Sequence, residues 1–436
     1  MHQYSQASTS IKDALSRLKA DSINKFFKER DCALDYYQYN NTGQYIANYF
    51  GGSLQSEIPL YTSNLTKRII KRISLVYKDA PIRQADDRYK DLCGRKDYEM
   101  KQFERLHNLL GTLAVRVYYK NGTLKRVPVL EYEPIFDHND SITPIAIIYP
   151  LTHPVSSQSD SAEDLFAYWS DSEHYILNGK GERTKVNEDN VNPYGVIPFV
   201  FLQPDTLVDE HWNAGAFDIA EANKQVDIAM TMLQHHIRSA GGQFVINGRV
   251  DAKNIEIGLN KVVVLEDGTM SNISANTSIT NIIDGIKFQM QNVAMNHHLS
   301  FDFGVSGNKS GVALKIENLE LLESREDATE QFREIERELY SLESRVIEVE
   351  SGLSLSPDFS VDFTEVNFPD PAQEIAEWEF KFKHGLADPV DWLMHNDPDR
   401  FLTREDAQAH LVERKQGQMQ VKKGADQKEN IFSLGR

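Results

Sequence analysis

The segment from Phe301 to Gly311 holds the residues whose types most suggest chemistry. A lysine-serine pair that follows glycines is typical of loops that bind phosphate groups, and here Gly304 and Gly307 precede Lys309 and Ser310. Such a loop, however, requires a glycine directly before the lysine and a strand leading into it. Asn308 occupies that position and a helical pattern precedes the segment. We therefore interpret the segment as a loop between two helices.

The remaining reactive residue types do not form a recognisable site. His235-His236 and His297-His298 are adjacent pairs, and neighbours on a helix point about 100° apart, unlike the i, i+4 spacing that chelates zinc. Cys32 and Cys93 lie far apart, which excludes a disulfide framework and a cysteine-rich zinc site. No Gly-x-Ser-x-Gly motif occurs, and the carboxylates are dispersed along polar faces. We predict no catalytic residue, no metal site and no cofactor.

Composition limits the class of protein. The 436 residues carry 47 Lys+Arg against 65 Asp+Glu, a formal net charge of −18, which argues against a broad nucleic-acid-binding surface. Forty per cent hydrophobic residues are enough for two to four compact units. No run reaches the roughly 18 apolar residues of a membrane span, and the first residues do not resemble a secretion signal. We expect a soluble protein made in a reducing compartment.

The first 110 residues are predicted to be helical. In the segment 63–77, apolar residues at helical spacing follow a Ser-Asn start, and Lys67, Arg68, Lys71 and Arg72 lie beside that stripe. These four cations could contact phosphate, although a solvated or salt-bridged face is the simpler interpretation. Ala80-Pro81 ends this segment, and residues 86–110 are expected to form another helix.

The pattern then changes to that of a β-rich lobe of about 90 residues. Segments 112–119, 127–132 and 142–149 are predicted strands, and Asn121-Gly122 is a tight-turn signal. Further strands are expected at 166–169, 174–177 and 196–201.

Two helices are predicted to flank a small β insert. Residues 214–239 form the first helix, and its apolar residues fall on two strips, which is typical of a helix packed on more than one side. Residues 244–246 and 261–265 are predicted strands of the insert, and 280–299 form the return helix. This order suggests a paired stem with a small β module at its tip.

The longest predicted helix begins near Leu321. From Ala328 to Val349 its apolar residues are spaced 4, 3, 4, 3, 4, 3, which is a heptad-like seam, and Ser351-Gly352 closes the helix. Phe359–Phe363 is a short alternating strand, Pro369-Asp370-Pro371 starts another helix, and short helices follow to about residue 416.

The order of these elements resembles that of tailed-bacteriophage portal (head-tail connector) proteins over roughly residues 30–415. The resemblance rests on short signatures: Gly195–Val200 leading into Asn213–Asp218, Phe303–Gly307 followed by Ser310–Leu314, and the C-terminal passages Val361–Phe363 and Leu402–Ala407. It implies an α+β, mainly helical fold with wing, stem, clip and crown regions that assembles as a ring. The chain leaves little room for an extended crown.

The resemblance divides the chain into nine segments. The wing would comprise a helical part at 1–111, a β-containing lobe at 112–212 and a strand at 352–370. The stem helix would be 213–240 and its return helix 280–300, with the β clip at 241–279 between them. A tunnel loop at 301–313 and a long wing/crown helix at 314–351 would follow, and 371–436 would form crown helices and the tail.

Three sets of site residues follow from the resemblance. The tunnel loop would face the DNA channel with Ser306, Asn308, Lys309 and Ser310. The clip, where the motor and adaptors would dock, would present Arg249, Asp251, Lys253, Glu256 and Lys261. The stem would pack through Ile219, Val226, Met230, Leu233 and Ile237.

The function that the resemblance implies is mechanical, without an enzymatic activity. A homo-oligomeric ring of about twelve copies would stand at one capsid vertex of the virion, after synthesis in the cytoplasm of the host bacterium. Double-stranded DNA would pass through it during packaging by a terminase, be retained, and leave at ejection. Head-tail adaptor proteins, the major capsid protein and scaffolding protein would be its partners, and no membrane is expected.

Two hypotheses from other classes stay open. The chain could be a cytoplasmic helical scaffold that dimerises through the 321–349 seam, or an enzyme of nucleic acid or nucleotides whose site is the glycine-rich loop. Neither requires a ring.

Overall fold

The computed structural model describes residues 8–20, 25–51, 59–151, 165–184, 190–204, 211–239, 243–248, 268–273, 279–299, 319–364, 371–396 and 403–411. The chain divides into two compact units. The first comprises Met1–Gly304 and Asn318–Val366, and the second comprises Val305–Glu317 and Asn367–Arg436. The predicted α+β class, richer in helix than in strand, is confirmed.

The N-terminal part of the first unit is built mainly from helices. They are α1 (Ile11–Ala20), α2 (Lys25–Gln38), α3 (Thr42–Phe50), α4 (Leu65–Ile73), α5 (Asp87–Leu92) and α6 (Lys96–Leu110). The expected continuous helix over 86–110 is wrong, because Gly94 has a φ of +64° and separates α5 from α6. The prediction of helix alone also missed strand β1 (Ile82–Gln84).

Two antiparallel sheets follow, and they confirm the predicted β lobe. β2 (Leu113–Lys120) lies between β3 (Thr123–Val129) and β9 (Phe199–Leu202). Asn121 and Gly122 join β2 to β3 with φ angles of +53° and +79°, as a tight hairpin turn requires. The second sheet runs in chain order through β4 (Glu133–Asp137), β5 (Asp140–Pro150), β6 (Leu165–Ser170), β7 (His174–Asn178) and β8 (Arg183–Thr184).

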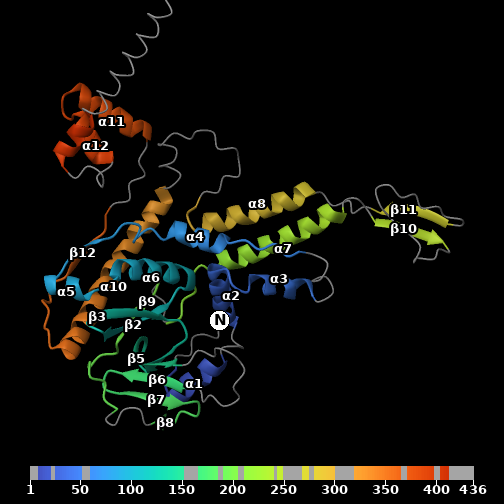
Figure 1. Ribbon diagram of the computed structural model, residues 1–436. Helices are drawn as coiled ribbons and strands as arrows, with labels where there is room; N and C mark the ends of the chain where they lie inside the picture. The colour runs from blue at the N-terminus through green and yellow to red at the C-terminus, as the bar shows by residue number, and fades with distance from the viewer. Residues whose placement is uncertain are drawn as a thin grey trace, which may run out of the picture. The chain divides into compact units, whose positions relative to one another are not determined.

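The long helix α10 (Leu319–Ser351) supplies one wall of the main core (Figure 1). Phe332, Ile335, Leu339, Leu342 and Val346 of the predicted seam are buried together with side chains of β2 and β9. The seam therefore faces the chain's own sheet, and a dimer that uses it as its contact surface is inconsistent with this fold. Gly352 ends the helix with a φ of +71°.

The predicted strand near 359–363 is confirmed as β12 (Ser360–Asp362), which pairs antiparallel with β1. Sequence analysis found β12 by its alternation, but did not find its partner. β1 is only three residues long and lies within a region of helices, so its local pattern is weak.

The pair of helices predicted around a β insert is present in the first unit. α7 (Phe217–Ser239) and α8 (Ile279–Asn296) lie side by side, and β10 (Gln243–Gly248) pairs with β11 (Gly268–Ile273) between them in the chain (Figure 1). The predicted strand at 261–265 lies outside the described residues.

The second unit contains α11 (Pro371–Lys383) and α12 (Pro389–Asn396), and residues 404–411 are also helical. The predicted start at Pro371 is confirmed. Val390, Leu393 and Ala407 form its small core, and Arg404 pairs with Asp388 and Asp391 at 2.5 and 2.7 Å. Among the helices of the described ranges in either unit, none has the length and apolar character needed to cross a membrane.

Candidate functional site

The paired helices α7 and α8 are attached to the rest of the first unit by the start of α7. Ile219 and Ala220 are buried against Tyr36 of α2, Ile70 of α4 and Leu109 of α6. These apolar contacts fix the first turns of α7. The later turns of the helix are held by other contacts. The position of α7 is therefore set at one end of the helix.

A row of polar side chains on α7 supplies a second attachment. Asn223, Asp227 and Thr231 recur every four residues and are all buried. The side-chain oxygen of Asn223 accepts hydrogen bonds of 3.0 Å from the backbone N–H groups of Leu65 and Thr66, which begin α4. Helix starts leave such N–H groups without partners, so Asn223 provides a cap for α4 from another helix.

Asp227 continues this attachment one turn further along α7. Its carboxylate accepts a 2.6 Å hydrogen bond from the hydroxyl of Ser63 and one of 3.2 Å from the Ser63 backbone N–H. Burial raises the pKa of Asp227 to about 6, against the opposing effect of the Ser63 hydrogen bonds. Thr231 completes the row by accepting a 3.0 Å hydrogen bond from the N–H of Tyr61.

An interaction between His297 and Asp218 links the C-terminal end of α8 to the N-terminal end of α7. His297 Nε2 lies 2.9 and 3.0 Å from the two carboxylate oxygens of Asp218, in the first turn of α7. Burial would raise the pKa of Asp218, but the hydrogen bond and positive field of His297 lower it. The contact between His297 and Asp218 thus holds the start of α7 against the end of α8.

A tight backbone crossing leads into α7. A Cβ on Gly111 would lie 2.0 Å from the Asn213 carbonyl oxygen, and one on Gly215 would lie 2.3 Å from the Gly111 nitrogen. Thr112 donates a backbone hydrogen bond of 3.2 Å to Asn213, and Ala216 donates one of 3.0 Å to Asn108. The glycines allow the chain entering α7 to pass directly against the end of α6.

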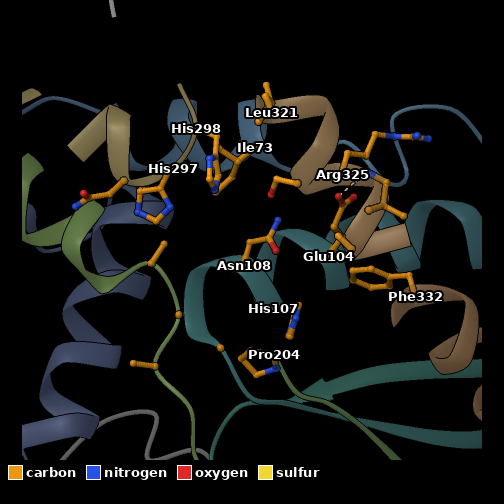
Figure 2. Close-up of a pocket in the computed structure, with 18 residues that line it drawn as sticks. Ile73, Glu104, His107, Asn108, Pro204, His297, His298, Leu321, Arg325 and Phe332 are labelled. Carbon is orange, nitrogen blue, oxygen red and sulfur yellow. Dashed lines mark hydrogen bonds between the residues drawn. The ribbon is translucent and has the colours of Figure 1, made fainter. Parts of the chain in front are cut away.

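A cavity of about 320 Å³ lies at this crossing (Figure 2). Its wall includes Glu104 and His107 of α6, His297 at the end of α8, and Arg325 and Phe332 of α10. Burial raises the pKa of Glu104 to about 7, although its carboxylate accepts hydrogen bonds from the N–H groups of Val76 and Tyr77 at 2.7 and 3.1 Å. Burial lowers the pKa of His107 to about 4.

Several large apolar side chains of the helix pair are exposed. Of the residues of α8, only Ala294 is fully buried, although the helix contains four isoleucines, a phenylalanine, two methionines and a valine. Phe288 is 62% exposed and Met295 is 71% exposed. On α7, Met232 and Ile237 are also exposed. Large apolar side chains of both helices are therefore in contact with water in the isolated chain.

The residues predicted for stem packing fall into different environments. Ile219, Val226 and Leu233 are buried, Met230 is half-buried and Ile237 is 55% exposed. The predicted tunnel-loop and clip residues lie outside the described residues, and so does the glycine-rich loop. Within the described ranges, no group of three or more His, Cys, Asp or Glu side chains could hold a metal ion, and His235-His236 are simply tilted neighbours on α7.

Sequence analysis missed a buried ionic cluster beneath α10. Glu336 and Glu343 lie seven residues apart on the face of the apolar seam and have no exposed surface. Lys96 contacts both carboxylates, at 3.0 and 3.3 Å, Arg83 binds Glu336, and Arg126 binds Glu343. The expectation that carboxylates lie on solvated faces is wrong for these two. Their spacing in step with Phe332 and Leu339 was the available signal.

No protein-family model matches the chain, and no curated protein matches it. A chain of the virion of a native gene transfer agent (GTA) particle is similar to it with a TM-score of 0.42 and 9% identity, over 83% of this chain and 92% of that chain.

Two neck structures of GTA particles are similar to the same degree. The neck of an empty particle, computed with C6 symmetry, gives a TM-score of 0.41 and 10% identity over 76% of this chain and 89% of that chain. The neck of a native particle, computed with C12 symmetry, gives 0.39 and 10% over 81% and 89%. All three neighbours are chains of GTA virion or neck structures.

Proposed function

We propose that this chain is the subunit of a portal-like ring that joins the head of a tailed virus particle to its tail. The ring of about twelve copies provides a channel for double-stranded DNA, through which a terminase packages the genome and from which the genome is later ejected. The proposal assigns the chain a structural role without catalysis.

The observation that carries this proposal is the exposure of large apolar side chains on α7 and α8. A helix such as α8, with a single fully buried residue, gains little stability from burial within its own chain. In a ring, each helix pair lies between two others, so the exposed Ile283 and Phe288 would be covered by neighbouring copies. The caps from Asn223 and Asp227 would fix the direction in which the pair points.

The net charge supports passage of DNA rather than its capture. Each copy carries −18, and a ring of such subunits repels a polyanion unless cations are concentrated at one place. The proposal places the 241–279 clip at the docking surface for terminase and head-tail adaptors, and the 301–313 segment with Lys309 at the channel. Capsid and scaffolding proteins would contact the remaining surface.

Native mass spectrometry and negative-stain images of the purified protein test the ring directly. We expect closed rings with a central hole for the wild type, and their loss in the variant Phe288→Asp. Removing an aromatic anchor from an interface costs about 2 kcal/mol or more, which is roughly a thirtyfold weakening of association. The matched control is Ile145→Asp, which changes an exposed apolar residue on β5, away from the helix pair.

A discrete dimer without a hole would contradict the proposal, as would rings that Phe288→Asp leaves intact. A second variant, Lys309→Ala, separates assembly from DNA handling. It should leave rings intact and change DNA packaging or retention, whereas loss of rings would make the 301–313 segment structural.

A further inference from the structure

The outward face of α4 is strongly basic. Thr66 and Ile70 are buried, and the opposite side of this nine-residue helix carries Lys67, Arg68, Lys71 and Arg72 with no acidic residue. Among the residues that the structure describes, Lys67, Arg68 and Lys71 form no ion pair with an acidic side chain; Lys67 lies over the ring of Tyr37 at 5.8 Å. In a chain of net charge −18, this concentration of cations stands out.

The outward face of the first half of α10 has the opposite sign. Glu323, Glu326, Asp327, Glu330, Glu334 and Glu338 recur every three or four residues on the side away from Phe332 and Leu339. Only Arg333 and Arg337 offset them, and Arg337 already pairs with Glu334. Four of these carboxylates, Asp327, Glu330, Glu334 and Glu338, line a groove of about 650 Å³. Arg333 and Arg337 line it too, together with Phe201, Gln203 and Pro204.

The carboxylates of this groove are unfavourably placed in an isolated subunit. Burial and the charge of Glu334 both raise the pKa of Glu338, so a neighbouring cation would stabilise the site. Asp327 and Glu330 are exposed and form no ion pair among the described residues. The chain thus carries two outward faces of opposite charge, one on α4 and one on α10.

We propose that the basic face of α4 on one copy docks into the acidic groove along α10 of the next copy. The partner is a second copy of this chain because the two faces are complementary in sign and each is presented on the outward side of its helix. Among the described residues, no ion pair joins Lys67, Arg68 or Lys71 to a carboxylate of α10. The contact is heterologous, so its repetition builds a ring or a filament. It rests on the proposed function in that the ring is the assembly it would help to close.

Charge reversal tests the contact in the full-length protein, with sedimentation velocity and native mass spectrometry at low salt. The variant Arg68→Glu/Lys71→Glu should weaken subunit association at least about tenfold, because like charges then face each other. Asp327→Lys/Glu330→Lys should do the same. The chain that carries all four changes should regain association to within about threefold of the wild type.

Lys120→Glu/Lys125→Glu is the matched control, since it makes the same charge change on exposed residues around the β2–β3 turn, and it should associate like the wild type. Neutral versions, Arg68→Gln/Lys71→Gln, replace any reversal that does not fold. Higher salt should weaken the wild-type contact.

Association that survives both reversals overturns this inference. Failure of the quadruple variant to regain association also overturns it. The basic face would instead bind nucleic acid if the quadruple variant stays dissociated and Arg68→Glu/Lys71→Glu alone abolishes DNA binding. Closed rings that neither reversal affects would refute this contact and leave the portal proposal standing. Salt-sensitive open oligomers that never close would refute the ring and retain the contact.

Discussion

Glu104 shows how burial alters the chemistry of a single residue at the base of α7 and α8. Its carboxyl group is enclosed at the cavity of Figure 2, and burial raises its pKa to about 7. His107, one turn away on α6, is enclosed at the same cavity, and burial lowers its pKa to about 4. The fold therefore favours the neutral form of both side chains, and the two respond to pH in opposite directions.

We predict that Glu104 makes the first unit less stable as the pH rises. Because its pKa in the folded state lies above its ordinary value, its contribution is fully present below about pH 4.5 and is lost as the pH passes through 7. The loss is about 3 kcal/mol in the free energy of unfolding. His107 acts in the opposite sense, with stability lost as the pH falls from about 6.5 towards 4.

Urea denaturation of the wild type and of Glu104→Gln at pH 4.5 and 7.5 measures the contribution of Glu104, since His107 is common to both. The wild type should lose about 3 kcal/mol relative to the variant between these two pH values. Parallel pH profiles for the two proteins would contradict the burial argument.

At the scale of elements, α10 is held to its sheet by charge as well as by apolar packing. Burial would raise the pKa of Glu336, but Lys96 and Arg83 lower it to about 2, so it stays ionised. Burial has the same opposed effect on Glu343, whose pKa Arg126 and Lys96 lower. The hydroxyl groups of Tyr77 and Tyr89 also donate hydrogen bonds to these carboxylates. The cluster specifies the rotation of α10 about its axis.

We predict that Glu343→Gln destabilises the first unit by about 3 kcal/mol, because two buried cations then share less negative charge. Lys96 would keep only Glu336, and Arg126 would keep only the partly exposed Glu99. Glu334→Gln removes an exposed carboxylate that pairs with Arg337 on the same helix, and should change stability by less than about 1 kcal/mol. Chemical denaturation of both variants measures the difference. If both variants lower the free energy of unfolding by the same small amount, the buried cluster does not depend on the charge of Glu343.

At the scale of the whole molecule, the two compact units have separate cores. The four apolar clusters of the first unit contain no residue beyond Phe363, whereas Val390, Leu393 and Ala407 form the cluster of the second. Unfolding of the first unit therefore does not require the contacts of the second.

We predict that a chain that ends at Val366 keeps the thermal transition of the first unit within about 3 °C. Differential scanning calorimetry of the truncated and full-length chains checks this. Loss of the transition, or a shift of ten degrees or more, would mean that residues 367–436 contribute to the stability of the first unit.

Much of the architecture was determined by local sequence signals. The hairpin at Asn121-Gly122 follows from residues that accept positive φ angles. The end of α10 follows from Gly352, and the start of α11 follows from Pro371. The heptad-like spacing of α10 and the alternation of β12 also identified these elements, because side-chain periodicity reflects which face of an element is buried. The resemblance in element order was drawn from the same signals.

Tertiary structure alone decided what covers those faces. The spacing along α10 shows that its seam is buried, but only the fold shows that β2 and β9 cover it. In the same way, the alternation of β12 does not show that its pairing partner is β1. Glu336 and Glu343 are tolerated in the core only because Arg83, Lys96 and Arg126 arrive from distant segments. A sequence pattern shows that a face is apolar or charged, but the free energy of burying it depends on groups that only the fold brings together.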